Sequence, residues 1–352
     1  MRRGLIEWSK TELPEAVFAM RVAQAQAALA ADGLDALVIY TNITRSAGAS
    51  WLTGFVPYWS EGVAVLPREG PPVLIVALTP RVKGWIERTS CAGSVTCAPR
   101  FGRETAKILA AANPAARIGV LELDTFPSGT AADLTAEGGT LVDATALFER
   151  LRASADPAEV ALTSRAASIA RDALAQIDAH AGSVAEEIAT VDGTARLAGA
   201  EDVFIAVAPD LARSDTFVRE VDVDATFGDT FAVRVTLAYK GHWMRAVRTF
   251  SRSDAGARAI LAANERFADA VARLPDTSAL AGAASWLIEG TVRSQPLETF
   301  AGSFGERSGI ALDGKVVSVT ATFTIDGMRV AVGGAAVVGS AWRASAALVA
   351  ST

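Results

Sequence analysis

Along the first 150 residues, segments with the apolar spacing of a helix alternate with apolar segments typical of strands. Alanine and apolar residues recur at helical spacing from Val17 to Ala31, and Asp32-Gly33 is suited to end that helix. The apolar run that follows, from residue 34 to Tyr40, is typical of a buried strand. Because strands and helices continue to alternate, we predict an α/β first domain. Its further elements are strands at 62–66, 73–78 and 117–123 and a helix at 104–112.

The pattern changes near residue 150, where a strong helix start appears. Asp156 is a good N-cap, Pro157 suits the first helical position, and Glu159 completes a capping box. We therefore predict a first domain over residues 1–152 and a second over residues 153–352. Helical spacing predicts two more helices in the second domain, at about 184–199 and 254–273.

In the second domain, a first hairpin is predicted between Asp229 and Phe250. If Lys240-Gly241 is a two-residue turn, residue 236 pairs with residue 245. One face of this hairpin is then apolar, and the other carries Arg234 and Arg245 as diagonal neighbours, about 7–8 Å apart between backbones. The same face also holds Thr236 and Trp243.

A second hairpin is predicted from Val316 to Val332 around Asp326-Gly327, a strong type I′ turn signal. One of its faces is wholly apolar. A sheet with one packed face often presents the other to solvent or to a pocket. The residues on that other face are Ser318, Thr320, Thr322, Thr324, Arg329 and Ala331.

Composition narrows the class of protein. A length of 352 residues favours about two domains. The net charge of -6, without a basic stripe, argues against a nucleic-acid partner, and no apolar stretch is long enough to cross a membrane. We expect a cytoplasmic protein. Cys91 and Cys97 are expected to be reduced structural thiols, and two histidines are too few for a typical zinc site.

Several segments resemble the creatinase, aminopeptidase P and prolidase family. Residues 51–55, W-L-T-G-F, resemble the family's Y-L-T-G-F, and residues 154–160 resemble the K-S-P-A-E-I that opens its catalytic domain. Residues 248–250 match the end of its T-R-T-F strand. The resemblance implies an α/β creatinase-like N-terminal domain and an α+β pita-bread C-terminal domain with a curved antiparallel sheet. It also implies a homodimer.

The family's peptidases hold two metal ions with two Asp, one His and two Glu, and the resemblance assigns each of these ligands to a position here. The two Asp positions hold Arg234 and Arg245, and the two Glu positions hold Thr320 and Ala331. The His position falls near Ser303 or Phe304. Cationic and neutral side chains are poor ligands for divalent metals. The resemblance therefore implies a divergent member that uses no metal or other cofactor and is not a metallopeptidase.

Two arginines on one face require a nearby anion. At 4–5 Å two guanidiniums repel by about 4 kcal/mol at an effective dielectric constant of 20. The anion is either a protein carboxylate, from Asp215, Glu220, Glu298 or Glu306, or a bound small anion. A third alternative is that the two arginines are exposed and have no functional role. The candidate substrate-binding residues are Arg234, Arg245, Thr236, Trp243, Thr320, Arg329, Arg213, His242 and Arg45. The candidate catalytic bases are Asp215, Glu298 and Glu306.

Two hypotheses for function follow. The first is a metal-independent enzyme that acts on a small anionic, carboxylate-bearing substrate in a specialised biosynthetic pathway, with C–N bond hydrolysis, lysis and rearrangement all open. The second is a catalytically inactive pseudo-peptidase that binds a ligand or a protein partner. A titratable group close to a bound ligand's reacting atom would distinguish the enzyme from the binding protein.

Overall fold

The computed structural model describes residues 9–57, 59–180, 183–219, 222, 224–305 and 309–339. The chain divides into two compact units at Ala153 and Ser154. One short segment is an exception. Thr291–Pro296 comes after residue 153 in the chain but belongs to the first unit. Each unit has its own sheet.

The first unit contains a six-stranded mixed sheet in the order β4-β3-β2-β1-β5-β6. The pair β1–β2 and the pair β2–β3 are antiparallel, whereas the other three neighbouring pairs are parallel. This arrangement confirms the predicted α/β class. The strands are β1 (Ala36–Thr41), β2 (Gly62–Pro67), β3 (Val73–Val76), β4 (Ser94–Cys97), β5 (Arg117–Val120) and β6 (Thr140–Asp143).

Both faces of this first sheet are covered by helices, which explains why its central strands are apolar throughout. Leu37 and Ile39 point to one side, and Val38 to the other, into separate apolar clusters. The first cluster includes residues of α1 (Glu15–Ala31), α2 (Ala47–Thr53), α3 (Lys83–Thr89) and α6 (Thr145–Leu151). The second includes residues of α4 (Phe101–Ala112) and α5 (Ser128–Ala136).

The second unit is built on a seven-stranded sheet in the order β11-β10-β12-β13-β9-β8-β7, in which all neighbours are antiparallel. Its strands carry the residues predicted for the site. They are β7 (Asp202–Ala208), β8 (Thr230–Tyr239), β9 (His242–Ser251), β10 (Ser285–Gly290), β11 (Glu298–Gly302), β12 (Val316–Ile325) and β13 (Met328–Val337).

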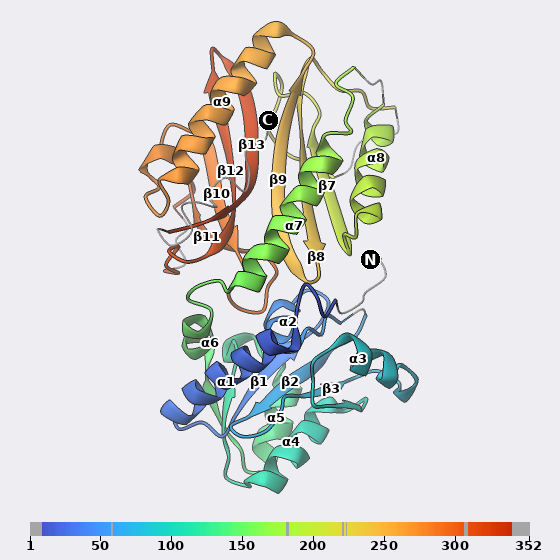
Figure 1. Ribbon diagram of the computed structural model, residues 1–352, viewed down its shortest axis with the longest axis vertical. Helices are drawn as coiled ribbons and strands as arrows, with labels where there is room; N and C mark the ends of the chain where they lie inside the picture. Colours follow the sequence, from blue (N-terminus) through green and yellow to red (C-terminus); the bar gives the residue numbers. More distant parts are fainter. Residues whose placement is uncertain are drawn as a thin grey trace. The chain divides into compact units, whose positions relative to one another are not determined.

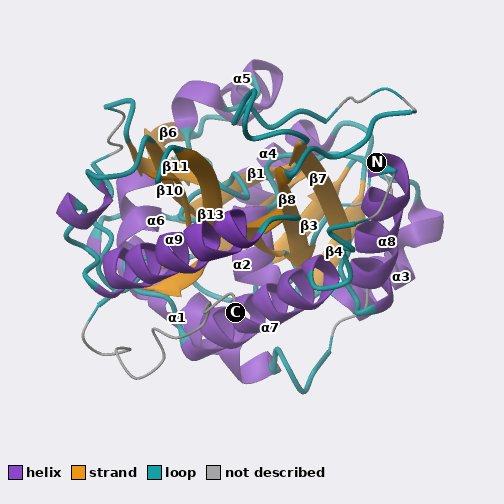
Figure 2. Cartoon of the chain, turned by 90° about the horizontal axis from the view of Figure 1, so that it is seen from above, coloured by secondary structure: helices purple, strands orange, loops and turns teal. Residues whose placement is uncertain are grey.

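Helices cover one face of this second sheet. The helix α7 (Pro157–Leu174) packs against β8 and β9, and α9 (Asp254–Ala272) packs against β13 and β9 (Figure 1). A third helix, α8 (Val184–Leu197), lies against β7. Figure 2 shows α7 and α9 on the same side of the strands. The predicted capping box at the start of α7 is present. No helix in the described part of the chain could cross a membrane.

Both hairpins have the predicted register. Thr236 pairs with Arg245 across β8 and β9, and Ile325 pairs with Met328 at the end of the second hairpin. The turn residues have positive φ angles, which are 50° at Lys240 and 77° at Gly241. The second turn is similar, with 49° at Asp326 and 80° at Gly327. These left-handed conformations are those that type I′ turns require.

The two halves of the second sheet meet at a seam with little backbone pairing. Within the described residues, β9 and β13 pair at a single position, Val247 with Gly333. Beside this pair, the Thr249 hydroxyl donates to the carbonyl oxygen of Ala331 at 2.7 Å and accepts from the backbone N–H of Ala331 at 3.0 Å. A side chain therefore completes hydrogen bonding where the strands diverge.

Candidate functional site

Arg234 and Arg245 lie on the sheet face opposite α7 and α9, as the hairpin pattern predicts. Arg234 pairs with Val247, and Arg245 pairs with Thr236, so the two arginines are diagonal neighbours. The neighbours of the two arginines along each strand, such as Val233 and Met244, are buried in the core. Alternation along the strands therefore fixes which face the arginines occupy.

Arg245 is held by three neighbours from three other strands. Its guanidinium forms an ion pair with Glu289 of β10, and its Nε donates to the Thr236 hydroxyl at 3.1 Å. Its backbone N–H donates to the Ser318 hydroxyl of β12 at 2.9 Å. The ion pair is largely withdrawn from solvent, since the Arg245 and Glu289 side chains are 18% and 8% exposed. These contacts make Arg245 a fixed part of the sheet.

Glu289 is the protein carboxylate that partly neutralises the two arginines. Burial raises the pKa of Glu289, while Arg245 and then Arg234 lower it by smaller amounts. Glu289 was absent from the carboxylates considered from sequence. Strand alternation places Glu289 on the same face as Ser285 and the apolar Leu287, so the sequence pattern alone gave only a weak sign of a polar face. The partner strand could not be inferred from that signal.

Arg234 differs from Arg245, because its guanidinium has no hydrogen bond or ion pair in the described residues. The guanidinium lies over the Phe217 ring, with 4.7 Å from Cζ to the ring centroid. Burial, followed by the neighbouring Arg245, lowers the pKa of Arg234 from its usual value. A half-buried cation of this kind gains electrostatic stabilisation when an anion approaches.

A cavity of about 350 Å³ lies beside Arg234 on this sheet face. Its wall contains hydroxyl groups, aromatic rings and one carboxylate, Asp215. The volume is at the lower end of those that hold small molecules. The lining residues are Asp215, Phe217, Arg234, Val247, Ser285, Trp286, Leu287, Thr299, Phe304, Thr320, Ala321, Thr322, Ala331 and Val332.

The cavity brings together only some of the predicted site residues. Arg234, Thr320 and Asp215 line it, whereas Arg245 and Thr236 are on the same sheet face but are not lining residues. The predicted base Glu298 pairs with Gly290, on the face of β11 opposite to Thr299, so it does not line this cavity. Glu306, also proposed as a base, lies outside the described residues.

The other predicted binding residues lie away from the cavity lining. Trp243 stacks on Phe204 of β7, with 5.8 Å between ring centroids. Arg329 donates to the Leu211 carbonyl oxygen at 3.2 Å, near the loop that follows β7. Arg213 is 88% exposed and pairs with Asp210. His242 pairs with Tyr239 at the hairpin end.

Arg45 is bound within the first unit. Its guanidinium contacts Glu122 at 3.0 Å, the Ser294 hydroxyl at 3.1 Å and the Thr125 carbonyl oxygen at 2.8 Å. Ser294 also donates to Glu122. Arg45 therefore has a full set of local partners, and it is not among the residues that line the Arg234 cavity.

Comparison with known families identifies the first unit. Residues 21–154 match the model of the creatinase/prolidase N-terminal domain. The first unit therefore carries a creatinase/prolidase N-terminal domain. No curated protein matches it at the level of sequence.

Solved structures share the fold of this chain over both units. Dipeptidase PepE from Mycobacterium ulcerans has a TM-score of 0.63 at 20% identity, over 92% of this chain and 94% of that chain. X-Pro aminopeptidase from Thermotoga maritima MSB8 has a TM-score of 0.64 at 16% identity, over 89% and 95%. The N-terminal domain of the FACT complex subunit SPT16 from Cicer arietinum has a TM-score of 0.55 at 14% identity, over 92% and 94%. At these identities the likeness shows the fold alone.

The residues of this sheet face do not fit a two-metal centre like that of the family's peptidases. Arg234 and Arg245 are cations, and Thr320 and Ala331 supply a neutral hydroxyl and a methyl group. Across the described residues no cluster of three or more His, Cys, Asp or Glu side chains is arranged to hold a metal ion. The one deeply buried carboxylate nearby, Glu289, is already paired with Arg245. The donor set is thus unsuited to two divalent cations.

Proposed function

We propose that this pita-bread protein binds a small carboxylate-bearing molecule at Arg234 and acts on it without a metal ion. The observation that supports this most directly is the half-buried Arg234 guanidinium, which faces a cavity and has no partner in the described residues. A carboxylate matches the planar fork of a guanidinium and forms two charge-assisted hydrogen bonds with it.

The charges around the cavity favour a ligand with a single negative charge. Arg245 and Glu289 largely cancel one another, whereas Arg234 has no ion pair within the described residues. Asp215 on the cavity wall would repel a more highly charged anion such as a phosphate dianion. A monocarboxylate satisfies both conditions, and Phe217 and Trp286 offer apolar rings to the rest of the molecule.

The chemical step that we propose is cleavage of a C–N bond by water. Solved structures with the same fold include a dipeptidase and an X-Pro aminopeptidase, and both names denote hydrolysis of such bonds. Asp215 is the carboxylate available on the cavity wall to accept a proton from the attacking water. That proton then passes to the departing amine as the C–N bond breaks, and Thr320 and Thr322 are suited to hold the ligand's polar atoms.

Binding without turnover is the second candidate function. It is favoured by the pairing of Glu289 with Arg245, because that buried carboxylate is then not free to move a proton. Under this alternative Asp215 has no catalytic role. The two candidates share the Arg234 contact, so they differ only in whether the ligand is changed.

A matched pair of ligands tests the binding step. N-acetylproline and N-acetylprolinamide differ mainly in the carboxylate, and calorimetric titration should detect binding of the first alone. Arg234→Gln should weaken binding by about 10- to 100-fold, the equivalent of losing a charge-assisted hydrogen bond of about 1.5–3 kcal/mol. Arg171→Gln is the control, since that arginine is exposed on α7 and pairs with Asp172. Equal affinity in the wild type and the Arg234 variant would refute the proposed site.

Mass spectrometry of the incubated ligand tests turnover. A panel of N-acyl amino acids and X-Pro dipeptides should give a cleaved product with the wild type, and Asp215→Asn should bind the same ligands without cleaving them. Ligand that binds but stays intact throughout supports the non-catalytic alternative. Metal analysis after dialysis against a chelator is a separate check. Near-stoichiometric Mn, Co, Zn or Fe would contradict metal independence.

A further inference from the structure

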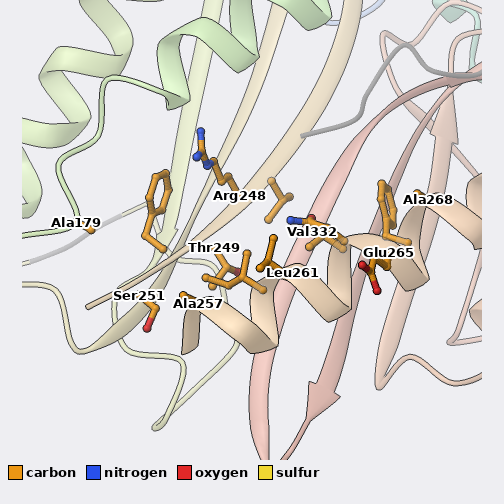
Figure 3. A pocket seen from close by; sticks show the side chains of 14 residues that line it. Ala179, Arg248, Thr249, Ser251, Ala257, Leu261, Glu265, Ala268 and Val332 are labelled. Carbon is orange, nitrogen blue, oxygen red and sulfur yellow. The ribbon is translucent and has the colours of Figure 1, made fainter. Parts of the chain in front are cut away.

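A second and larger cavity lies on the helix-covered face of the same sheet. It has a volume of about 640 Å³, is lined by β9, β13 and α9, and is open to solvent along exposed residues of α9 such as Leu261 (Figure 3). This volume is in the range of cavities that hold small organic ligands. Most of the lining is apolar, including Phe250, Ile260, Leu261, Phe267 and Val332.

The basic residue of this cavity is Arg248. Alternation along β9 places it on the same face as Ala246 and Phe250, both of which are buried. Its guanidinium lies 5.2 Å from the Phe250 ring centroid and has no hydrogen bond or ion pair within the ranges that the structure describes. An arginine on a face otherwise packed with apolar residues therefore keeps donors available for an anion.

The acidic residue of the cavity is Glu265, which lies apart from Arg248. In the view of Figure 3, Leu261 and Val332 lie between the two charged side chains. Glu265 is exposed on α9 and forms no ion pair with Arg248. The cavity thus has a cationic end, an apolar middle and a solvated acidic rim.

This cavity is distinct from the one beside Arg234. The two approach the sheet from opposite faces and share only Val247 and Val332, at the seam between β9 and β13. Arg248 and Arg234 are on opposite faces of the hairpin, because Arg248 pairs with Val233 and Arg234 pairs with Val247.

We propose that the cavity under α9 is a second ligand site, for a small amphipathic carboxylate. The carboxylate pairs with the Arg248 guanidinium, and the hydrocarbon part lies between α9 and β13. Charge complementarity selects the orientation, since the opposite one would place the anion next to Glu265. A medium-length unbranched chain suits the cavity, because its lining includes Val332 of β13 and the apolar Ile260 and Leu261 of α9.

Titration of the full chain with decanoate tests this site, with 1-decanol as the uncharged comparison. Decanoate should bind, and Arg248→Gln should weaken it by about tenfold or more. Ala268→Trp places a large ring in the cavity from a solvent-exposed position of α9, so it should abolish binding without disturbing the core. Arg234→Gln should leave decanoate affinity unchanged, since its guanidinium is on the other sheet face.

Several results would overturn the second site. If Arg234→Gln abolished decanoate binding and Arg248→Gln left it unchanged, the ligand would be using the other cavity. Equal affinity for decanol and decanoate would refute the role of the carboxylate charge. No binding at millimolar decanoate would refute the site itself. A crystal structure grown with decanoate provides the direct view. Residues 340–352 or a second copy of the chain found in the cavity would also overturn the proposal.

Discussion

Removing one partner of the Arg245–Glu289 ion pair should destabilise the protein far more than removing both. At hydrogen-bond contact, about 3 Å, two opposite charges attract by about 5 kcal/mol at an effective dielectric constant of 20. Desolvation of the two nearly buried groups, which costs several kcal/mol per ion, offsets much of that attraction. The pair therefore adds little net stability, but either charge left alone in the same place is costly.

The corresponding variants are Arg245→Met, Glu289→Leu and the double variant. Each single substitution should lower the free energy of unfolding by about 3–5 kcal/mol, because it leaves a buried charge without its partner. The double variant should lie within about 1 kcal/mol of the wild type. Urea denaturation at pH 7, followed by circular dichroism, gives the three differences. If the single effects add to within about 0.5 kcal/mol, the two residues are not coupled and the argument fails.

The pH dependence of the Arg245→Met variant provides an internal check. Burial raises the pKa of Glu289, so the folded protein holds this proton more tightly than the unfolded chain does. The stability due to this carboxyl group is therefore greatest below its unfolded pKa, about 4.3, and falls as the pH rises through the folded value. Loss of the Arg245 cation should strengthen that dependence. The variant should lose less stability at pH 5 than at pH 7, relative to the wild type.

Three further predictions follow from other contacts. Arg234→Met should leave the free energy of unfolding unchanged or raise it by up to about 1 kcal/mol, because it removes an unpaired, half-buried cation; a loss above about 2 kcal/mol in urea denaturation would contradict this. Thr249→Val should cost about 1–3 kcal/mol in the same assay, since the buried hydroxyl makes both of its hydrogen bonds with Ala331 at the seam, and a neutral result would mean that the seam does not need it. Burial raises the pKa of Cys91 and of Cys97, so alkylation by iodoacetamide should reach half its maximal rate above about pH 8.5, and rates equal to those of free cysteine would refute this.

Local patterns in the sequence determined much of the second unit's framework. The capping box at Asp156 and Glu159 fixed the start of α7, since its hydrogen bonds join residues three positions apart. The turns at Lys240-Gly241 and Asp326-Gly327 fixed the hairpin registers, and strand alternation then placed Arg234 and Arg245 on one face. Short helices such as α2 and α3 were not predicted, because seven residues give too little periodicity.

The tertiary structure alone decided what surrounds the two arginines. Glu289 comes from β10, 44 positions after Arg245, and its strand reaches the site only through pairing with β12. Phe217 comes from the loop after β7, and it lies beneath Arg234 because the fold brings that loop to the sheet face. Periodicity tells which face a side chain takes but not which distant strand lies beside it, because that choice depends on packing between elements far apart in the chain. The same reason explains why Arg245 is paired whereas Arg234 faces a cavity, although the sequence presents them as equivalent.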